Sequence, residues 1–209
     1  CACLVGSEMC IRDRPYLVPM LENAGANVLL PRERDCQTAE IIIDNDGCLN
    51  TNSTYTEHTA DKVWRQGTGK GFAHLRPQYI DFENPFKEGT FRIAETVKKG
   101  KESTAEWIPE IPQNGQYAVY VSYQTVPNSS DDALYTVYHK GGVSQFKVNQ
   151  KMGGGTWVYL GTFGFDAGKS NACKVTLSNR SAKAGQTVTA DAVKIGGGMG
   201  NIAPVSYTH

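Results

Sequence analysis

The chain has 209 residues, with 21 basic and 21 acidic side chains and therefore no formal net charge. Proteins that bind nucleic acid or anionic membranes by electrostatic attraction need an excess of basic residues, so this balance argues against both partners. No run of about 18 apolar residues is present, so no transmembrane helix is expected. The many Gly, Thr, Tyr and Val residues are typical of a β-rich protein with tight turns.

The two ends of the sequence are related to each other. One codon choice for Glu8 to Asp13 (EMCIRD) has a reverse complement that encodes VSYTHL, and residues 205–209 read VSYTH. Two ends encoded by opposite strands of one short DNA segment resemble a library adapter, namely the translated end of a commonly used sequencing transposon. Residues 1–14 and 204–209 are therefore expected to be adapter sequence and are set aside from the fold.

Without these ends the cysteines are Cys36, Cys48 and Cys173, an odd and sparse set that is not a disulfide framework. A pair between Cys36 and Cys48 stays open, but free thiols are expected. The chain is also expected to be a fragment of a longer protein. The absence of a signal peptide would then say nothing about secretion.

The first third of the chain has mixed character. Residues 15–26 (PYLVPMLENAGA) have apolar residues at helical spacing and a Gly-Ala stop, which predicts the end of an amphipathic helix. Residues 28–30 predict a short buried strand, so the two elements form an α/β unit. Residues 41–43 predict another strand, followed by a DNDG turn at 44–47. Residues 48–80 have weak periodicity and are predicted to be a linking segment.

From about residue 81 the pattern becomes that of an all-β protein. Short strand-like stretches recur, with Gly, Pro, Asn and Asp turn formers between them. In residues 117–123 the set YVVY alternates with AYS, so one face should be core and the other should meet solvent or a partner. Eight strands at this spacing predict an antiparallel β-sandwich of jelly-roll type. The predicted strands are 90–96, 104–108, 116–125, 133–139, 142–149, 156–163, 173–178 and 187–195.

Five stretches in this second part carry a family resemblance. They are WIPEIPQNGQYAVYVSY, ALYTVYHKGGVSQFKVNQ, GGGTWVYLGTFGFDAG, VTLSNRS and VTADAVKIGGGMG, in this order within residues 81–200. Together they resemble the golvesin C-terminal-like domain, also called the xanthan lyase carbohydrate-binding-like domain. The resemblance implies a β-sandwich attached to secreted enzymes that act on polysaccharide or cell-wall polymer. It therefore implies a glycan or peptidoglycan partner and an extracytoplasmic (periplasmic or secreted) location.

A second resemblance involves residues 15–43. The string LENAGANVLLPRERD is similar to the helix, Gly-Ala turn and strand of a zinc-dependent N-acetylmuramoyl-L-alanine amidase. In proteins of this joint type the sandwich is inserted within the amidase domain, which would then be a partner of the module. The resemblance implies that residues 15–47 are a partial α/β fragment of a truncated hydrolase domain. It also implies a zinc-dependent parent that cleaves the amide between a muramoyl sugar and a peptide stem.

The zinc chemistry itself does not map onto this chain. A catalytic zinc takes about three protein ligands and keeps a position open for water. None of the His, Glu and His ligands of the amidase family can be assigned to a residue here. The chain is therefore expected to be inactive by itself, with no catalytic residue, no metal ligand and no cofactor of its own.

Aromatic residues are the best candidates for ligand binding. Sugars present C–H faces that stack on aromatic rings, while nearby polar groups bind their hydroxyls. Sandwich cores also use Trp and Tyr, so a packing role stays open for each ring. Tyr120 and Tyr138 alternate away from apolar neighbours and are expected to be the more exposed ones. The candidate ligand-binding residues are Trp107, Tyr120, Tyr138, Trp157 and Tyr159.

Other polar clusters have simpler interpretations. Glu57-His58 with His74 lacks the HExxH spacing, so these are expected to be solvated loop residues. The DNDG string lacks the Glu that a calcium loop needs at its end. The pair Asp131-Asp132 lies among turn formers, which favours a turn over a glycosidase acid–base pair.

Two further features are interpreted as structural. His139 ends a strand beside Lys-Gly-Gly and is expected to cap a turn or to be partly exposed. The Gly runs 153–155 and 196–198 lack the strand-to-helix context and the Lys-Ser/Thr tail of a phosphate-binding loop. They are expected to permit tight turns or close backbone packing.

Three functions remain open for the chain. The favoured one is a non-catalytic module that binds carbohydrate or cell-wall polymer and belongs to a secreted cell-wall hydrolase. The alternatives are an architectural module that packs on a catalytic domain, and a part of a polysaccharide lyase-type enzyme. The predicted organisation is adapter (1–14), amidase-like fragment (15–47), linking segment (48–80), β-sandwich (81–200) and adapter (204–209).

Overall fold

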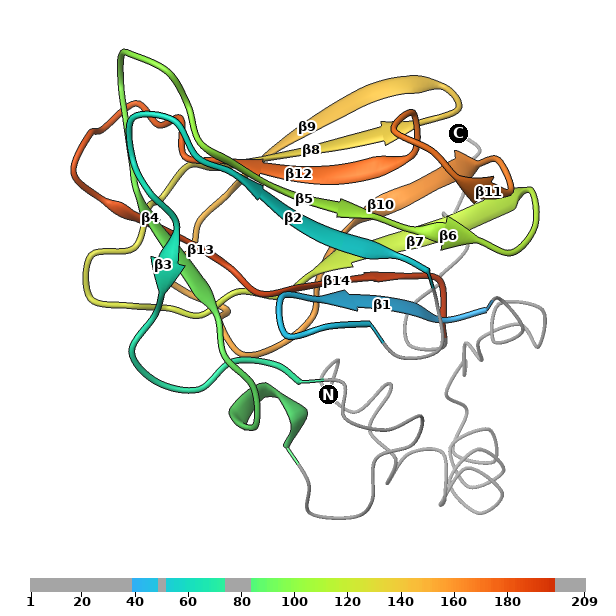
Figure 1. Cartoon of the computed structure of the whole chain (residues 1–209), viewed down its shortest axis with the longest axis horizontal. Helices are drawn as coiled ribbons and strands as arrows, with labels where there is room; N and C mark the ends of the chain where they lie inside the picture. Colours follow the sequence, from blue (N-terminus) through green and yellow to red (C-terminus); the bar gives the residue numbers. More distant parts are fainter. Residues whose placement is uncertain (1–38, 49–51, 74–83, 198–209) are drawn as a thin grey trace, which may run out of the picture. The chain divides into compact units, whose positions relative to one another are not determined.

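The computed structural model describes residues 39–48, 52–73 and 84–197, which form a sandwich of antiparallel sheets (Figure 1). This confirms the predicted mainly β fold. The one helical element of the described residues is a short 3-10 helix at Pro85–Lys87, and no helix among them could span a membrane. The strands are β1 (Ile41–Asp44), β2 (Thr54–His58), β3 (Arg65–Gln66), β4 (Arg92–Glu95), β5 (Thr104–Ile108), β6 (Glu110–Ile111), β7 (Gly115–Val121), β8 (Ala133–His139), β9 (Gly142–Val148), β10 (Val158–Phe165), β11 (Gly168–Lys169), β12 (Lys174–Ser178), β13 (Thr187–Ala190) and β14 (Ala192–Ile195).

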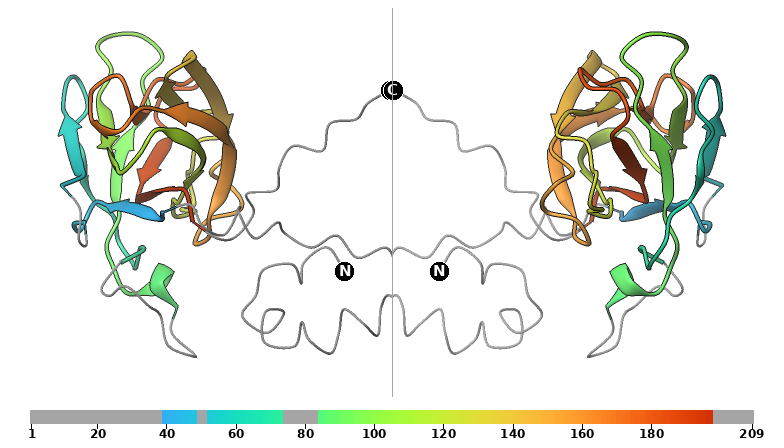
Figure 2. Two further views of the ribbon diagram at one scale, coloured as in Figure 1. Left: turned by 90° about the vertical axis from the view of Figure 1, so that its right-hand side faces the viewer. Right: turned by 90° about the vertical axis from the view of Figure 1, so that its left-hand side faces the viewer.

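Two sheets form the layers of the sandwich, which the views in Figure 2 show from the side. The four-stranded sheet has the order β1-β14-β7-β10, and the five-stranded sheet has the order β2-β5-β12-β8-β9. Smaller sheets of the orders β13-β4-β3 and β11-β6 complete the described part. Each of the eight predicted strand regions contains a strand, and the last one is divided into β13 and β14 at Asp191.

The sheets include more of the chain than the sequence predicts. β1 confirms the strand predicted at residues 41–43, which was expected to belong to the α/β fragment of residues 15–47, and it pairs with β14 through Ile41 and Ile195. β2, which falls in the expected linking segment 48–80, pairs with β5 through Tyr55 and Trp107. Residues 39–196 form one compact unit. The difference arises because both strands have partners far along the chain, and a local pattern contains no information about such partners.

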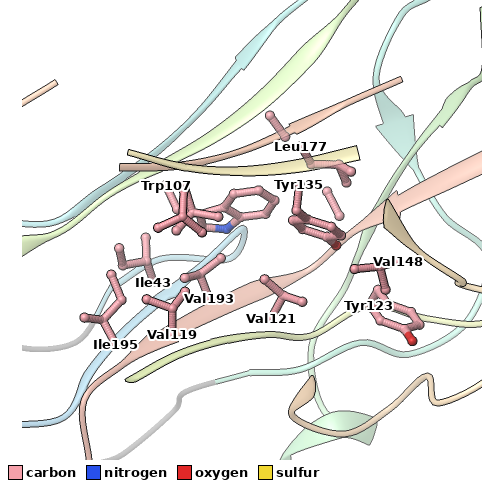
Figure 3. Close-up of a cluster of buried hydrophobic side chains, with 14 of the residues drawn as sticks. Ile43, Trp107, Val119, Val121, Tyr123, Tyr135, Val148, Leu177, Val193 and Ile195 are labelled. Carbon is pink, nitrogen blue, oxygen red and sulfur yellow. The ribbon is translucent and has the colours of Figure 1, made fainter. Parts of the chain in front are cut away.

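The core lies between the two large sheets (Figure 3). Alternate residues of β7, among them Val119 and Val121, point into it as predicted. Trp107 of β5 is fully buried, and its ring stacks on that of Tyr135 with centroids 6.5 Å apart. The indole Nε1 of Trp107 donates a hydrogen bond to the backbone oxygen of Asp191 at 3.3 Å. This bond joins the two sheets through the centre of the core.

Several predicted features lie outside the described residues. They are both adapter-like ends, the helix at 15–26, the strand at 28–30, Cys36 and His74. The two described cysteines, Cys48 and Cys173, are free thiols.

Candidate functional site

The outer face of the four-stranded sheet holds a row of large side chains. The strand register places Lys194 of β14 beside Tyr120 of β7, and Tyr120 beside Tyr159 of β10. Side chains directly opposite each other on antiparallel strands lie about 5 Å apart on one face. The Tyr120 and Tyr159 rings are accordingly in contact, with centroids 5.3 Å apart.

Three more aromatic rings adjoin this row. Trp157 lies 4.9 Å from Phe72 and 5.5 Å from Phe86 between ring centroids, and the two Phe rings are 5.2 Å apart. These rings pack against Ile42 and Ala192 of the outer face. The ammonium of Lys194 connects the two groups because it lies 4.5 Å from the Tyr120 ring centroid and 5.4 Å from that of Trp157. We name the set Phe72, Phe86, Tyr120, Trp157 and Tyr159 the outer aromatic cluster.

A β-bulge sets the position of Tyr159. The register between β10 and β7 shifts between Tyr159 and Gly161, so that β10 contains one extra residue at this point. In a regular strand, residues three apart point to opposite faces. The bulge instead brings Tyr159 and Thr162 to the same face, where their hydroxyl oxygens are 2.8 Å apart. The sequence analysis did not predict this bulge.

The loop before β10 is anchored by buried hydrogen bonds and positions Trp157. Gln150 is fully buried, and its amide exchanges two hydrogen bonds of 2.8 Å with the backbone of Thr189. The Tyr123 hydroxyl donates to the Met152 oxygen at 2.7 Å. A buried polar network of this kind holds a loop in one arrangement once every member has its partner. The chain that leads into Trp157 is therefore held in one position.

The Gly run 153–155 serves this loop as predicted. Gly153 and Gly155 have φ values of 73° and 70°, in the left-handed region that favours glycine. A Cβ atom at Gly154 would lie 2.5 Å from the backbone nitrogen of Thr125. The run thus provides both the tight turns and the close backbone approach.

Phe72 is positioned by a pair of short segments. Gly71 and Gly89 exchange backbone hydrogen bonds of 2.9 and 3.0 Å. A Cβ atom at Gly89 would lie 1.7 Å from the Phe72 oxygen, so this approach requires glycine. The Phe72 amide also donates to both carboxylate oxygens of Asp191 at 3.1 Å. Phe72 and Phe86 could not be predicted from the sequence, because no periodic pattern marks residues that approach a sheet from a connecting segment.

The candidate residues differ widely in exposure. Tyr159 is 47% exposed and Trp157 is half-buried, so both present part of a ring to solvent. Tyr120 is only 5% exposed, so the prediction that it is among the more exposed rings is wrong. The Lys194 ammonium and the Tyr159 ring both contact its ring. Trp107 belongs to the core and does not reach the surface.

Lys194 is an ammonium group in an apolar setting. Its residue is 5% exposed, and the nearest carboxylate oxygen, that of Glu40, is 3.9 Å from its Nζ. Burial lowers the pKa of Lys194, although the Glu40 charge acts in the opposite direction. Lys194 was not among the predicted candidate residues. The alternation in AVKI places it on the outer face, but the register that sets it between two rings is not visible in the sequence.

Tyr138 lies on a different surface, the outer face of the five-stranded sheet. It is half-buried, and the Lys174 ammonium lies 5.4 Å from its ring centroid. Lys174 donates to both carboxylate oxygens of Glu106, at 3.1 and 3.0 Å. His58 lies 3.6 Å from the same carboxylate. This surface is polar, and Tyr138 is separate from the outer aromatic cluster.

The possible metal ligands are not brought together. The Glu57 carboxylate accepts hydrogen bonds from Arg92 at 2.6 and 3.0 Å and from the Tyr55 hydroxyl at 2.7 Å. His58, the next residue of β2, instead lies near Glu106. In the part of the chain that the structure describes, no group of three or more His, Cys, Asp or Glu residues could hold a metal ion. These residues therefore do not fit a zinc ion.

The remaining polar candidates have structural partners. Asp131 forms ion pairs with Lys151 and Lys183 at 2.8 and 2.7 Å. Asp132 accepts hydrogen bonds from the 181–182 segment, so neither carboxylate is arranged for acid–base catalysis. The Nδ1 of His139 accepts from the backbone of Gly141 at 3.1 Å, which confirms the predicted turn cap.

Comparisons with known proteins agree with this architecture. Xanthan lyase of Bacillus sp. (strain GL1) is 33% identical over 96 residues, which cover 46% of this chain and 10% of that protein. The solved structure of Paenibacillus xanthan lyase matches with a TM-score of 0.57 at 23% identity over 78% of this chain and 13% of that chain, which supports the fold. The chain thus spans about a tenth of the length of these relatives. The Golvesin C-terminal domain matches residues 85–197, more than half of the chain, so the chain belongs to the Golvesin C-terminal domain family.

Proposed function

We propose that this chain is a non-catalytic carbohydrate-binding module that binds sugar rings on its outer aromatic cluster. The observation that supports this most is the pair Tyr159 and Trp157, which are partly exposed on one outer face. Aromatic rings that offer a face to solvent suit the C–H faces of sugars. The similarity to xanthan lyases, which are named for a polysaccharide, supports the same class of ligand.

The surroundings of these rings suit a binding site in two further respects. The rings are fixed in advance by the bulge at Gly161 and by the anchored loop before Trp157. Rigid contact residues lose little conformational entropy on binding. Polar groups also lie beside the rings, since the exposed Thr162 hydroxyl meets that of Tyr159 at 2.8 Å. Such groups would bind sugar hydroxyls. A module with this ligand would act outside the cytoplasm.

The proposal is tested by native affinity electrophoresis of the full chain in gels that contain soluble polysaccharides, together with pull-down on insoluble peptidoglycan. At least one polymer should retain the wild-type protein. Tyr159→Ala should weaken that binding about tenfold, as expected for loss of an aromatic contact at the centre of a site. Tyr159 is nearly half exposed, so this change should leave the unfolding midpoint almost unchanged.

Tyr138→Ala is the matched control, because it removes a half-buried Tyr from the outer face of the other large sheet. It should leave retention unchanged. Retention that survives Tyr159→Ala but is lost in Tyr138→Ala would move the site to the five-stranded sheet. A folded wild-type protein that no polymer retains would contradict carbohydrate binding and favour the architectural role.

A second proposal concerns the protein to which the module belongs. Ile41 of β1 is paired directly with Ile195 of β14, so the first and last described strands are neighbours. Such adjacency suits a module inserted into a loop of another domain. Together with the amidase resemblance of residues 15–43, it supports a cell-wall hydrolase as the parent. Its zinc ligands would lie beyond the described residues. A longer reading frame without the His, Glu and His ligands would contradict this proposal.

A further inference from the structure

Lys194 is a buried cation without a hydrogen bond. An ammonium group has three N–H donors, yet the Nζ of Lys194 donates to no acceptor among the described residues. Its side chain is 6% exposed, and the Glu40 oxygen at 3.9 Å is beyond hydrogen-bond distance. A buried charge is costly unless it is paired and hydrogen-bonded. The Lys194 ammonium therefore has one distant ion-pair partner, Glu40, and no hydrogen-bond acceptor among the described residues.

Lys174 is a lysine of the same molecule that is hydrogen-bonded to a carboxylate, and it serves as a comparison. It also lies over a Tyr ring, that of Tyr138, at 5.4 Å from the centroid. Unlike Lys194, it donates to both oxygens of Glu106, at 3.1 and 3.0 Å. The contact with an aromatic ring is thus common to both lysines. Lys194 differs because its carboxylate partner, Glu40, lies 3.9 Å away and accepts no hydrogen bond from it.

The Lys194 ammonium lies beside the candidate binding site. It lies over the rings of Tyr120 and Trp157, and Tyr120 contacts the exposed Tyr159. A ligand stacked on Trp157 and Tyr159 would bring its substituents near Nζ. The approach of Glu40, whose side chain is 42% exposed, shows that a carboxylate can reach this side of the ammonium.

We propose that the outer aromatic cluster binds an acidic glycan, with the Lys194 ammonium donating hydrogen bonds to the carboxylate of a sugar unit. This inference rests on the proposed function and specifies its ligand class. The rings of Trp157 and Tyr159 hold the sugar, and Lys194 selects for its charge. The ligand carboxylate takes the place of Glu40, whose exposed side chain turns to solvent.

The test uses two pairs of polymers whose members differ in charge: polygalacturonate with its methyl ester, and carboxymethyl cellulose with hydroxyethyl cellulose. Affinity electrophoresis of the full chain should show about tenfold tighter binding to the carboxylated member of at least one pair, as expected for a charge-assisted hydrogen bond. Lys194→Met, which keeps an unbranched apolar stem, should abolish this preference, so that the carboxylated and neutral members of each pair bind equally well.

Lys174→Met is the matched control and should retain the full preference, because Lys174 lies on the other sheet and is already paired. Preference that persists in Lys194→Met, or that is lost equally in Lys174→Met, would overturn the inference. Equal binding of the wild type to both members of every pair would also overturn it but would leave carbohydrate binding intact. Failure of all four polymers to retain the folded protein would overturn the acidic specificity, and the wider polymer panel would then decide the proposed function.

Discussion

At the scale of single residues, two buried carboxylates have raised pKa values that link the stability of the fold to pH. Asp44 is 2% exposed and Asp191 is fully buried. Burial, reinforced by the charge of Asp191, raises the pKa of Asp44 to about 9. Burial raises the pKa of Asp191 to about 6, although hydrogen bonds from Phe72, Gln124 and Ser122 oppose the shift. Both groups hold their protons to higher pH in the folded protein than in the unfolded chain.

We therefore expect the free energy of unfolding to fall as the pH rises from about 4, the ordinary Asp value, through 6 and towards 9. In this window the folded state binds more protons than the unfolded state, and stability then decreases with pH. Asp44→Asn resembles the protonated carboxyl but does not titrate. It should be more stable than the wild type at pH 7 and should flatten the upper part of the profile. Urea unfolding across this range measures both effects.

Asp131→Asn provides a control of opposite sign. Hydrogen bonds and charge from Lys151 and Lys183 lower the pKa of Asp131 to about 2. Its stabilising contribution is present above about pH 4 and is lost as the pH falls through about 2. The substitution should therefore lower stability at pH 7. If Asp44→Asn proves the less stable of the two variants at that pH, the assignment of a protonated Asp44 is wrong.

The sequence predicts part of the site at this scale. Trp157 and Tyr159 are candidate residues with partly exposed rings in the outer aromatic cluster, whereas the candidate Tyr138 lies on the other large sheet. Tyr120 follows the same alternation but is buried, because side chains on neighbouring strands cover it. Alternation indicates the face on which a residue lies, whereas exposure depends on what packs over that face. Lys194 was not predicted either, because the register that places it beside the rings of neighbouring segments is not visible in the sequence.

At the scale of elements, the bulge in β10 is the feature that shapes the site. Gly161 lies at the register shift, and a Cβ atom there would approach the Cζ of Phe163 to 2.8 Å. Its φ of 156° is also one that residues with side chains rarely adopt. A larger residue would have to move the Phe163 ring or straighten the strand, and either change would disturb Tyr159.

Gly161→Ala should destabilise the fold by about 1–2 kcal/mol and weaken glycan binding. Gly164→Ala in the same strand is the matched control. Its added Cβ would lie 3.2 Å from the end of the flexible Gln116 side chain and at ordinary contact distance, 3.8 Å, from the Cβ of Lys140. Its effect should therefore stay within about 0.5 kcal/mol. Urea midpoints together with affinity electrophoresis test both variants. Equal stability of the two would show that the bulge does not depend on Gly161.

Most strands from residue 90 onward were predictable because their alternation and turn residues are local, but the two-residue strands β6 and β11 were not predicted. β1 and β2 were assigned to other segments, since the register of Ile41 with Ile195 and of Tyr55 with Trp107 is set by distant partners. The division of the last predicted strand at Asp191 was also missed. A short apolar run does not indicate which sheet it joins, and a bulge or break has no signal in a pattern with a period of two.

At the scale of the whole molecule, the described sandwich presents two unlike outer faces. The four-stranded sheet bears the outer aromatic cluster and the Lys194 ammonium, whose carboxylate partner Glu40 lies 3.9 Å away. The five-stranded sheet bears Tyr138 within a polar network in which Lys174 and Glu106 are already paired. Membership of the Golvesin C-terminal domain family is consistent with either face as the binding surface. The geometry favours the first, because only there do several rings converge.

An NMR titration of the full ¹⁵N-labelled chain with the polymer fragment that it retains tests this choice most directly. The chain contains three tryptophans, whose indole N–H signals can be followed separately. The signal of Trp157 should shift together with the amides around Tyr159 and Thr162, while Trp64 and Trp107, at 3% and 0% exposure, should stay in place. Shifts confined to the residues around Tyr138 and Lys174, with Trp157 unmoved, would contradict the account.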